Sequence, residues 1–164
     1  MNDSYIVING KRAELTKEQL KTLGVEVRKN PFERVDKNDY YYYVRADGHV
    51  DVYTNTNDSV DKEIYAACNH FNDKKFAEQV ALHQLLYRKL LKFAYDNECE
   101  DNQEWNKTNC HYYISYSIDE GRFYVDVTGS FKHNDVWFCS RKSAECAIKE
   151  IVEPFMKEHP DFVW

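Results

Sequence analysis

Helical and alternating hydrophobic patterns follow one another along the chain and predict a mixed α+β fold. The longest helical pattern runs from Lys74 to Asn97, where apolar residues recur every three or four positions. A second helical pattern begins at Arg141, and Pro154 predicts a kink or an early end near Glu153 because proline has no N–H to donate. The predicted buried stripes are Phe76, Val80, Leu85, Leu86, Leu90 and Phe93 in the first helix, and Ala144, Ile148, Ile151, Val152 and Phe155 in the second.

Two segments of alternating polarity around tight turns predict β-hairpins ahead of these helices. The first turns at Asp47-Gly48 and the second at Glu120-Gly121. Pairing across the second turn separates an apolar face from a polar face. The predicted core face is Ile114, Tyr116, Ile118, Phe123, Val125 and Val127, and the predicted solvated face is Tyr113, Ser115, Ser117, Arg122, Tyr124 and Asp126.

The order of hairpin, loop, aromatic segment and helix occurs twice, which predicts a repeat-like architecture. Phe71 and Phe138 each stand just before a helix start, and the first copy has a longer loop around residues 54–61. We therefore expect two ββ(β)α units, at 39–97 and 110–159, that share a mostly antiparallel sheet with both long helices on one side.

The first 24 residues predict a small N-terminal ββα module. Asn9-Gly10 favours a two-residue hairpin turn, and Thr16 with Gln19 forms a capping box that starts a short helix. Gly24 suits the left-handed residue that ends a helix. So small a module is not stable alone, and we expect it to dock on the rest of the chain. The predicted organisation is a module at 1–24, a linker at 25–38 and a main α+β domain at 39–164.

Tyrosines on the first hairpin are the first candidate for a functional site. Mapping the second hairpin onto the first through the repeat predicts a core face of Tyr41, Tyr43, Val50 and Val52. The face left for solvent is then Tyr40, Tyr42, Val44 and Tyr53. Tyrosine rings stack on nucleobases and offer a hydroxyl, so this face predicts a ligand site. The alternative is that these tyrosines hold the N-terminal module.

Cations at both helix starts are the second candidate. Lys74-Lys75 and Arg141-Lys142 stand where free amides and the helix dipole favour negative charge. A bound phosphate would stabilise them there, whereas the alternative is that they point away into water. The predicted ligand-binding residues are therefore Tyr40, Tyr42, Tyr53, Lys74, Lys75, Arg141 and Lys142.

Composition excludes several classes of function. There are 22 Lys+Arg against 28 Asp+Glu, a net charge of −6, which argues against general nucleic-acid binding. No apolar run approaches the about 18 residues of a membrane span, so we expect a cytoplasmic protein. Thirteen Tyr, nine Phe and three Trp leave aromatic surface to bury, which favours a homodimer or a larger homo-oligomer.

Metal and cofactor sites are not indicated by the cysteines and histidines. Cys68 with His70, and Cys110 with His111, lack a second pair at zinc-site spacing. No CxxC motif occurs, and the five cysteines are expected to be reduced thiols. We predict no metal and no cofactor.

A catalytic site is not indicated either. Cys139 could act as a nucleophile with His111 or His133 as base, but a small buried thiol is the favoured interpretation. No nucleophile, base and orienting group can be assembled, so we predict no catalytic residues and no enzyme. The acidic run at 96–104 is predicted to be a solvated loop that could engage a basic partner surface.

Several distinctive segments are spread over nearly the whole chain. They are Ile8-Asn9-Gly10-Lys11, Glu14 to Leu20, Leu23-Gly24, Asn30-Pro31-Phe32-Glu33-Arg34-Val35, Tyr40 to Tyr43, Ala77 to His83, Pro154 to Lys157 and His159 to Trp164. Together they resemble a widespread group of small uncharacterised proteins encoded by phages and prophages of Gram-positive bacteria. That group has no assigned catalytic motif to carry over.

The resemblance implies a setting in the cytoplasm of a bacterial host, where small accessory phage proteins commonly act on host defence. We expect a binding protein that sequesters a nucleotide-derived immune signal. One alternative is an inhibitor that masks a host defence protein, such as a CRISPR or other nuclease. An enzyme that cleaves a nucleotide signal is the third.

Overall fold

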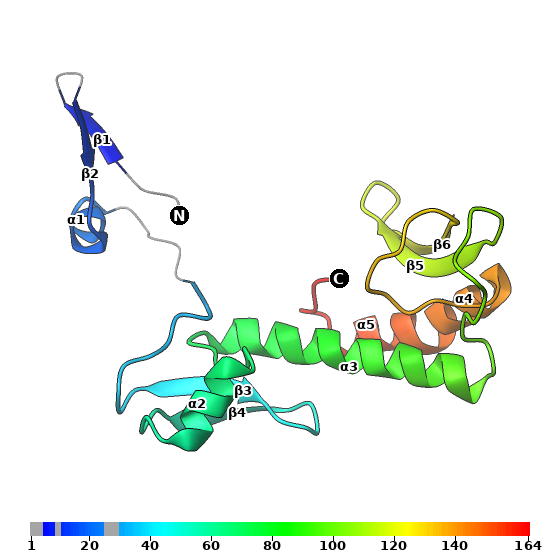
Figure 1. Ribbon diagram of the computed structural model, residues 1–164, viewed down its shortest axis with the longest axis horizontal. Helices are drawn as coiled ribbons and strands as arrows, with labels where there is room; N and C mark the ends of the chain where they lie inside the picture. The colour runs from blue at the N-terminus through cyan, green and yellow to red at the C-terminus, as the bar shows by residue number, and fades with distance from the viewer. Residues whose placement is uncertain (1–4, 9–10, 25–29) are drawn as a thin grey trace.

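The computed structural model describes residues 5–8, 11–24 and 30–164. Over these ranges the strands form three separate two-stranded antiparallel sheets, and helices pack against the second and third (Figure 1). The predicted mixed α+β class is confirmed, but the predicted shared sheet is wrong because no described strand joins two hairpins. The strands are β1 (Tyr5–Ile8), β2 (Lys11–Glu14), β3 (Tyr40–Val44), β4 (Val50–Thr54), β5 (His111–Ser117) and β6 (Arg122–Thr128). The helices are α1 (Lys17–Thr22), α2 (Ser59–Ala66), α3 (Lys74–Asp96), α4 (Arg141–Ala147), the π-helix η1 (Ile148–Val152) and α5 (Glu153–Glu158).

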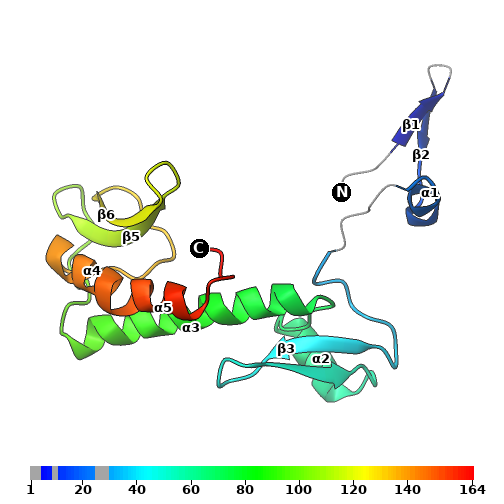
Figure 2. The same cartoon turned by 180° about the vertical axis from the view of Figure 1, so that it is seen from behind.

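The long helix α3 connects the two parts of the main domain, as Figure 2 shows from behind. Its start is as predicted, and Asp73 caps it by accepting the N–H of Phe76 at 3.0 Å. The first part of α3 packs on β3 and β4 through Ala77 and Ala81. The later part packs on α4 and η1 in a second and larger core, to which it contributes Leu86, Leu90, Phe93 and Ala94.

The register of β3 and β4 differs by one residue from the predicted one. Tyr41 pairs with Tyr53, and Tyr42 pairs with Val52. Residues 45–49 connect the paired strands here, whereas 118–121 connect them in the second hairpin, so the first loop is one residue longer. A shift of one residue moves every side chain of a strand to the other face. Tyr53 therefore shares a face with Tyr41, not with Tyr40 and Tyr42.

Helix α2 begins near the end of the segment 54–61, which was predicted to be a longer loop, and continues beyond it to Ala66. It begins with a capping box in which the Asp58 and Asp61 side chains accept each other's backbone N–H. Asp61 is fully buried and accepts the Tyr41 hydroxyl at 2.9 Å. The face of the hairpin that carries Tyr41 is thus covered by α2. The two acids three residues apart were the sequence signal for this helix.

The second hairpin follows the predicted separation of faces in part. Ile114 and Val125 pair across it and are buried in the larger core. Phe123 packs against the same core. The prediction is wrong for three residues of that core face: Ile118 lies in the turn and is 88% exposed, and Tyr116 and Val127 are 41% and 40% exposed.

The C-terminal helix continues through Pro154 instead of ending before it. Between α4 and α5 it widens into the π-helix η1. A π turn changes the hydrogen-bond spacing just ahead of the residue that lacks an N–H, so the chain stays helical without the predicted break. The predicted buried stripe is confirmed: Ala144, Ile148, Val152 and Phe155 are buried and Ile151 is partly buried.

Both hairpins of the main domain carry Val-Asp-Val in the second strand. Asp51 accepts the N–H of Val52 at 2.9 Å, and Asp126 accepts that of Val127 at 2.8 Å. An N–H occupied in this way is not available to a strand from another chain. The shared motif therefore gives one backbone N–H of each strand an acceptor within its own chain.

The N-terminal module has the predicted elements but not the predicted docking. The backbone N–H of Thr16 donates to Gln19 Oε1 at 2.9 Å, and that of Gln19 donates to Thr16 Oγ1 at 3.2 Å, which confirms the capping box. Gly24 has the expected left-handed φ of 69°. The turn at Asn9-Gly10 lies outside the described residues. Figures 1 and 2 show the module standing away from the later sheets.

The described part of the predicted linker, residues 30–38, packs on the first hairpin unit. The Asn72 amide donates to the carbonyl oxygens of Asn30 and Glu33 at 2.9 and 3.0 Å. The Phe32 ring lies 5.2 Å from that of Phe71. This segment is thus part of the main domain's structure.

Candidate functional site

The seven ligand residues predicted from the sequence are not brought together. Tyr40, 68% exposed, and Tyr53, 43% exposed, lie on opposite faces of the first hairpin. Tyr42 packs against the core beneath α3. A single tyrosine face of the predicted kind does not form, because the longer turn places Tyr53 on the α2 side.

The predicted cations are also dispersed. Lys74 pairs with Glu78 at 3.5 Å on α3, whereas Arg141 donates to the backbone carbonyl of Val125 at 3.0 Å. Lys75 and Lys142 are exposed. Asp73 and Ser140 cap the two helices, so some of the free amides already have acceptors.

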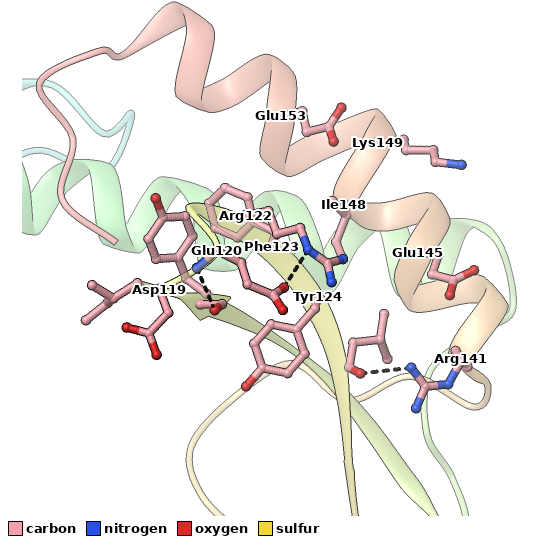
Figure 3. A pocket seen from close by; sticks show the side chains of 14 residues that line it. Asp119, Glu120, Arg122, Phe123, Tyr124, Arg141, Glu145, Ile148, Lys149 and Glu153 are labelled. Atoms are coloured by element: carbon pink, nitrogen blue, oxygen red, sulfur yellow. Dashed lines mark hydrogen bonds and ion pairs between the residues drawn. The ribbon is translucent and has the colours of Figure 1, made fainter.

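A charged groove of about 880 Å³ lies between the β5–β6 hairpin and the α4–η1 helix (Figure 3). Arg122 pairs with Glu120 at 2.6 Å within it, and Arg141 is held by Val125. Carboxylates outnumber cations along its wall, so it does not favour an anionic ligand. Its charged residues are Asp119, Glu120, Arg122, Arg141, Glu145, Lys149 and Glu153.

A second groove, of about 970 Å³, lies between α3 and β5 and is the better candidate for a ligand site. We call it the aromatic groove. Residues 133–135 line it from the loop after β6, and Phe162 and Trp164 line it from the C-terminal tail. Its aromatic side chains are Tyr87, Tyr113, Tyr116, Tyr124, Phe162 and Trp164, and its titratable groups with nitrogen are His83, Arg88 and His133. Asp135 is the one carboxylate among the described residues that line it.

Ring contacts and hydrogen bonds hold the walls of the aromatic groove. Tyr113 donates its hydroxyl to Asp126 at 3.0 Å, and its ring lies 5.0 Å from that of Trp137. The Trp137 indole N–H donates to the His133 carbonyl at 3.3 Å. Trp164 packs edge-on against Phe123 at 4.8 Å. These contacts restrict the side chains that a ligand would meet.

Arg88 is the cation of the aromatic groove. It is exposed and forms no ion pair with any residue that the structure describes. Its Nη2 lies 3.2 Å from where a Cβ on Gly48 would stand, so the guanidinium lies close to the turn between β3 and β4, where Gly48 adopts a φ of 89° that favours glycine. A guanidinium with no ion-pair partner among the described residues can pair with an anionic group of a ligand.

Sequence reasoning missed this groove although α3 carried a signal for it. His83 and Tyr87 stand four residues apart, so they lie on one face of the helix. That face was not part of the predicted buried stripe. Only the fold shows that β5 and the C-terminal tail lie opposite it.

A buried His–Asp pair connects the loop that precedes β5 to the first residue of that strand. His111 is fully buried, its Nδ1 contacts the Asp101 carboxylate, and its ring stacks on Trp105 at 3.7 Å. Asp101 belongs to the acidic run predicted to be solvated, and its side chain is only 1% exposed. For Asp101 the prediction is wrong, because its carboxylate contacts His111 in the interior of the protein.

The pair provides a base and an orienting group but no nucleophile. Cys139 is exposed, which contradicts the predicted buried thiol, and its described partner is Ser143 Oγ at 3.8 Å. His111 Nε2 has no hydrogen-bond partner in the described part of the chain. The geometry therefore supports a structural role for this pair.

His70 is a second buried histidine, and it makes the stability of the protein sensitive to acid. Its ring stacks on Tyr41 at 4.1 Å, and neither ring nitrogen has a partner among the described residues. Burial lowers the pKa of His70 below its usual 6.5, because the apolar surroundings disfavour the charged ring. The unfolded chain then binds more protons than the folded one, so stability should fall as the pH drops below 6.5.

Replacing His70 by phenylalanine should keep the stacking and remove part of this acid sensitivity. Urea unfolding at about pH 7.5 and about pH 5 measures the free energy of unfolding for each protein. The variant should lose less stability in acid than the wild type. His49→Gln is the control, since His49 is 80% exposed, and an equal acid loss in His70→Phe would contradict the assignment.

Over 5–8, 11–24 and 30–164 no group of His, Cys, Asp or Glu is arranged to hold a metal ion. Within the same ranges no helix is long and apolar enough to cross a bilayer. Comparison with known proteins finds no matching family model, no matching curated protein and no matching solved structure.

Proposed function

We propose that the protein binds a small nucleotide-type ligand in the aromatic groove. The observation that carries the proposal is the composition of its wall: six aromatic rings and an unpaired Arg88 against a single carboxylate. The volume of about 970 Å³ lies at the upper end of the range for small-molecule sites. Rings suit a base, and a guanidinium suits a phosphate.

Tyr87 and Tyr116 are the proposed stacking residues. They are each 41% exposed, so each ring has a face or edge that solvent can reach. A base that covers them would bury apolar surface now in water and gain stacking energy. Arg88 would contact the phosphate, because it has no competing carboxylate partner among the described residues.

In the phage setting that the sequence resembles, such binding would withdraw a nucleotide-derived signal from host defence. We propose binding without cleavage. The buried His111 has no described nucleophile next to it, and the aromatic groove carries no nucleophile paired with a base. The two ββα units, with their shared Val-Asp-Val motif, are proposed to derive from one repeat. The homo-oligomer remains a prediction that light scattering tests.

A nucleotide-binding experiment tests the proposed function. The full chain is incubated with a panel of GMP, AMP, cyclic dinucleotides and ADP-ribose, and calorimetry measures the dissociation constants. Tyr87→Ala should weaken the binding of any member that binds by about tenfold, because one stacked ring is worth about 1–3 kcal/mol. Tyr95→Ala is the matched control, since Tyr95 lies on the same helix, is 63% exposed and does not line the groove.

The fate of the ligand separates the alternatives. Ligand recovered intact after the protein is denatured supports sequestration, whereas a cleaved product would assign the protein to the enzymes. If no panel member binds, the proposal is wrong. Masking of a defence protein would then become the preferred function, with the exposed Glu98 and Glu104 of the acidic loop as its first candidates.

A further inference from the structure

We infer that residues 133–135, at one end of the aromatic groove, accept hydrogen bonds from the edge of the base. We infer that this contact selects a guanine-type base over adenine. This inference rests on the proposed function and names the ligand class within it. It comes from the position and the bonding of Asp135.

Asp135 has one carboxylate oxygen in use and one available. Its Oδ1 accepts the N–H of Val136 at 2.8 Å. Its Oδ2 lies 3.8 Å from His133 Nε2, which is beyond hydrogen-bond distance. The carboxylate is only 33% exposed, so water solvates it incompletely. Oδ2 accepts no hydrogen bond from the described residues, so it can accept N–H groups from a ligand.

Burial also raises the pKa of Asp135, and the Val136 N–H and the neighbouring His133 only partly offset the effect. The direction agrees with the geometry: the carboxylate is short of donors. A ligand with N–H donors would stabilise the charged form.

The two purines differ in what they present to a carboxylate. Guanine has adjacent N–H donors at N1 and N2, which two carboxylate oxygens or one oxygen in a forked arrangement can accept. Adenine has the N6 amino donor next to the N1 acceptor, so its N1 lone pair would face the carboxylate. The adenine N1 lone pair repels the carboxylate, and the hydrogen bond that guanine N1–H would donate is lost. Both effects favour guanine.

The charges of the groove agree with such a ligand. Arg88 comes from α3, whereas Asp135 comes from the loop after β6, so the cation and the anion belong to different walls. A guanine nucleotide has its N–H donors on the base and its negative charge on the phosphate. The base of such a ligand would donate to Asp135, and its phosphate would contact Arg88.

The decisive experiment compares GMP, IMP and AMP on the full-length protein by calorimetry. GMP should bind at least about tenfold more tightly than AMP, since a bidentate contact discriminates by about 1–3 kcal/mol. IMP, which has N1–H but no amino group at C2, should lie between them. Asp135→Asn should remove most of the preference for GMP, because GMP loses a charged acceptor whereas AMP binding becomes stronger, since the amide can donate to adenine N1.

Asp119→Asn is the matched control, because Asp119 lies in the turn between β5 and β6 and lines the charged groove but not the aromatic groove. It should leave all three affinities unchanged. Circular dichroism and thermal unfolding establish that Asp135→Asn is folded. Equal binding of GMP and AMP, or an equal loss for both in Asp135→Asn, would overturn the inference and leave the proposed function standing. The inference also fails if none of the three nucleotides binds while another member of the panel does. If no member of the panel binds, the proposed function itself is refuted.

Discussion

Replacing Phe138 by alanine is expected to lower the free energy of unfolding by about 4 kcal/mol, within the 3–5 kcal/mol typical of a buried phenylalanine. Phe138 is 0% exposed and belongs to the larger core. Its backbone N–H donates to the Tyr112 carbonyl at 2.9 Å, and this bridge joins the entry to α4 to the strand β5. Removing the ring loses its burial and leaves a cavity that the surrounding helices and strands cannot fully close.

Phe131→Ala is the matched control for this variant. Phe131 lies in the same connection between β6 and α4, but it is 76% exposed. Its truncation should change stability by less than about 0.5 kcal/mol. Urea unfolding followed by circular dichroism measures both variants. If Phe138→Ala lowers the free energy of unfolding by less than about 1 kcal/mol, the Phe138 ring does not stabilise the larger core as expected.

Replacing Asp61 by alanine is expected to cost about 3 kcal/mol, because it leaves buried polar groups without their acceptor. The Asp61 carboxylate accepts the hydroxyls of Tyr41 at 2.9 Å and Thr56 at 3.1 Å, and it also accepts the backbone N–H of Asp58 at 3.2 Å. Tyr41 and Asp61 are both fully buried between α2 and the first hairpin. Water cannot replace the lost acceptor without opening that contact.

The pH dependence of this contact has a definite sign. Burial would raise the pKa of Asp61, but the hydrogen bonds from Tyr41, Asp58 and Thr56 outweigh it and lower the pKa below 3.8. Because the folded-state value is the lower one, this stabilisation is complete well above pH 3.8 and is lost as the pH falls below it. Asp61→Ala should therefore lose stability less steeply than the wild type in this acid range.

Glu63→Ala is the control on the same helix, because Glu63 is exposed. It should change stability by less than about 0.5 kcal/mol. The double variant Tyr41→Phe with Asp61→Ala should be less destabilised than the sum of the two single changes, since each alone disrupts the same hydrogen bond. Simple additivity would contradict a direct Tyr41–Asp61 interaction.

The helices were predictable because their signals are local. The starts of α3 and α4 and their buried stripes follow from residues within a few positions of one another. The capping box of α1 and, in part, the face separation of β5 and β6 were correct for the same reason. Helix α2 was missed although Asp58 and Asp61 carried the signal, because the repeat led us to expect a loop there.

The candidate site was harder to predict, because its residues come from several separate segments. Arg88 lies on α3, Tyr116 on β5, Asp135 in a loop and Trp164 in the tail. Nothing in the local sequence of any one of them indicates the others. The predicted site failed to assemble because one extra residue in the first turn moved Tyr53 to the other face.

The sequence by itself determined the α+β class, the long helices and the pairing of strands within each hairpin, since hydrophobic period, caps and turn residues act over short range. The tertiary structure decided that the three hairpins stay separate, that α2 covers Tyr41 and that α3 faces β5 across an aromatic groove. These outcomes depend on burial between distant segments. Each apolar face can be covered by more than one partner, and only the packing of the whole chain selects among them.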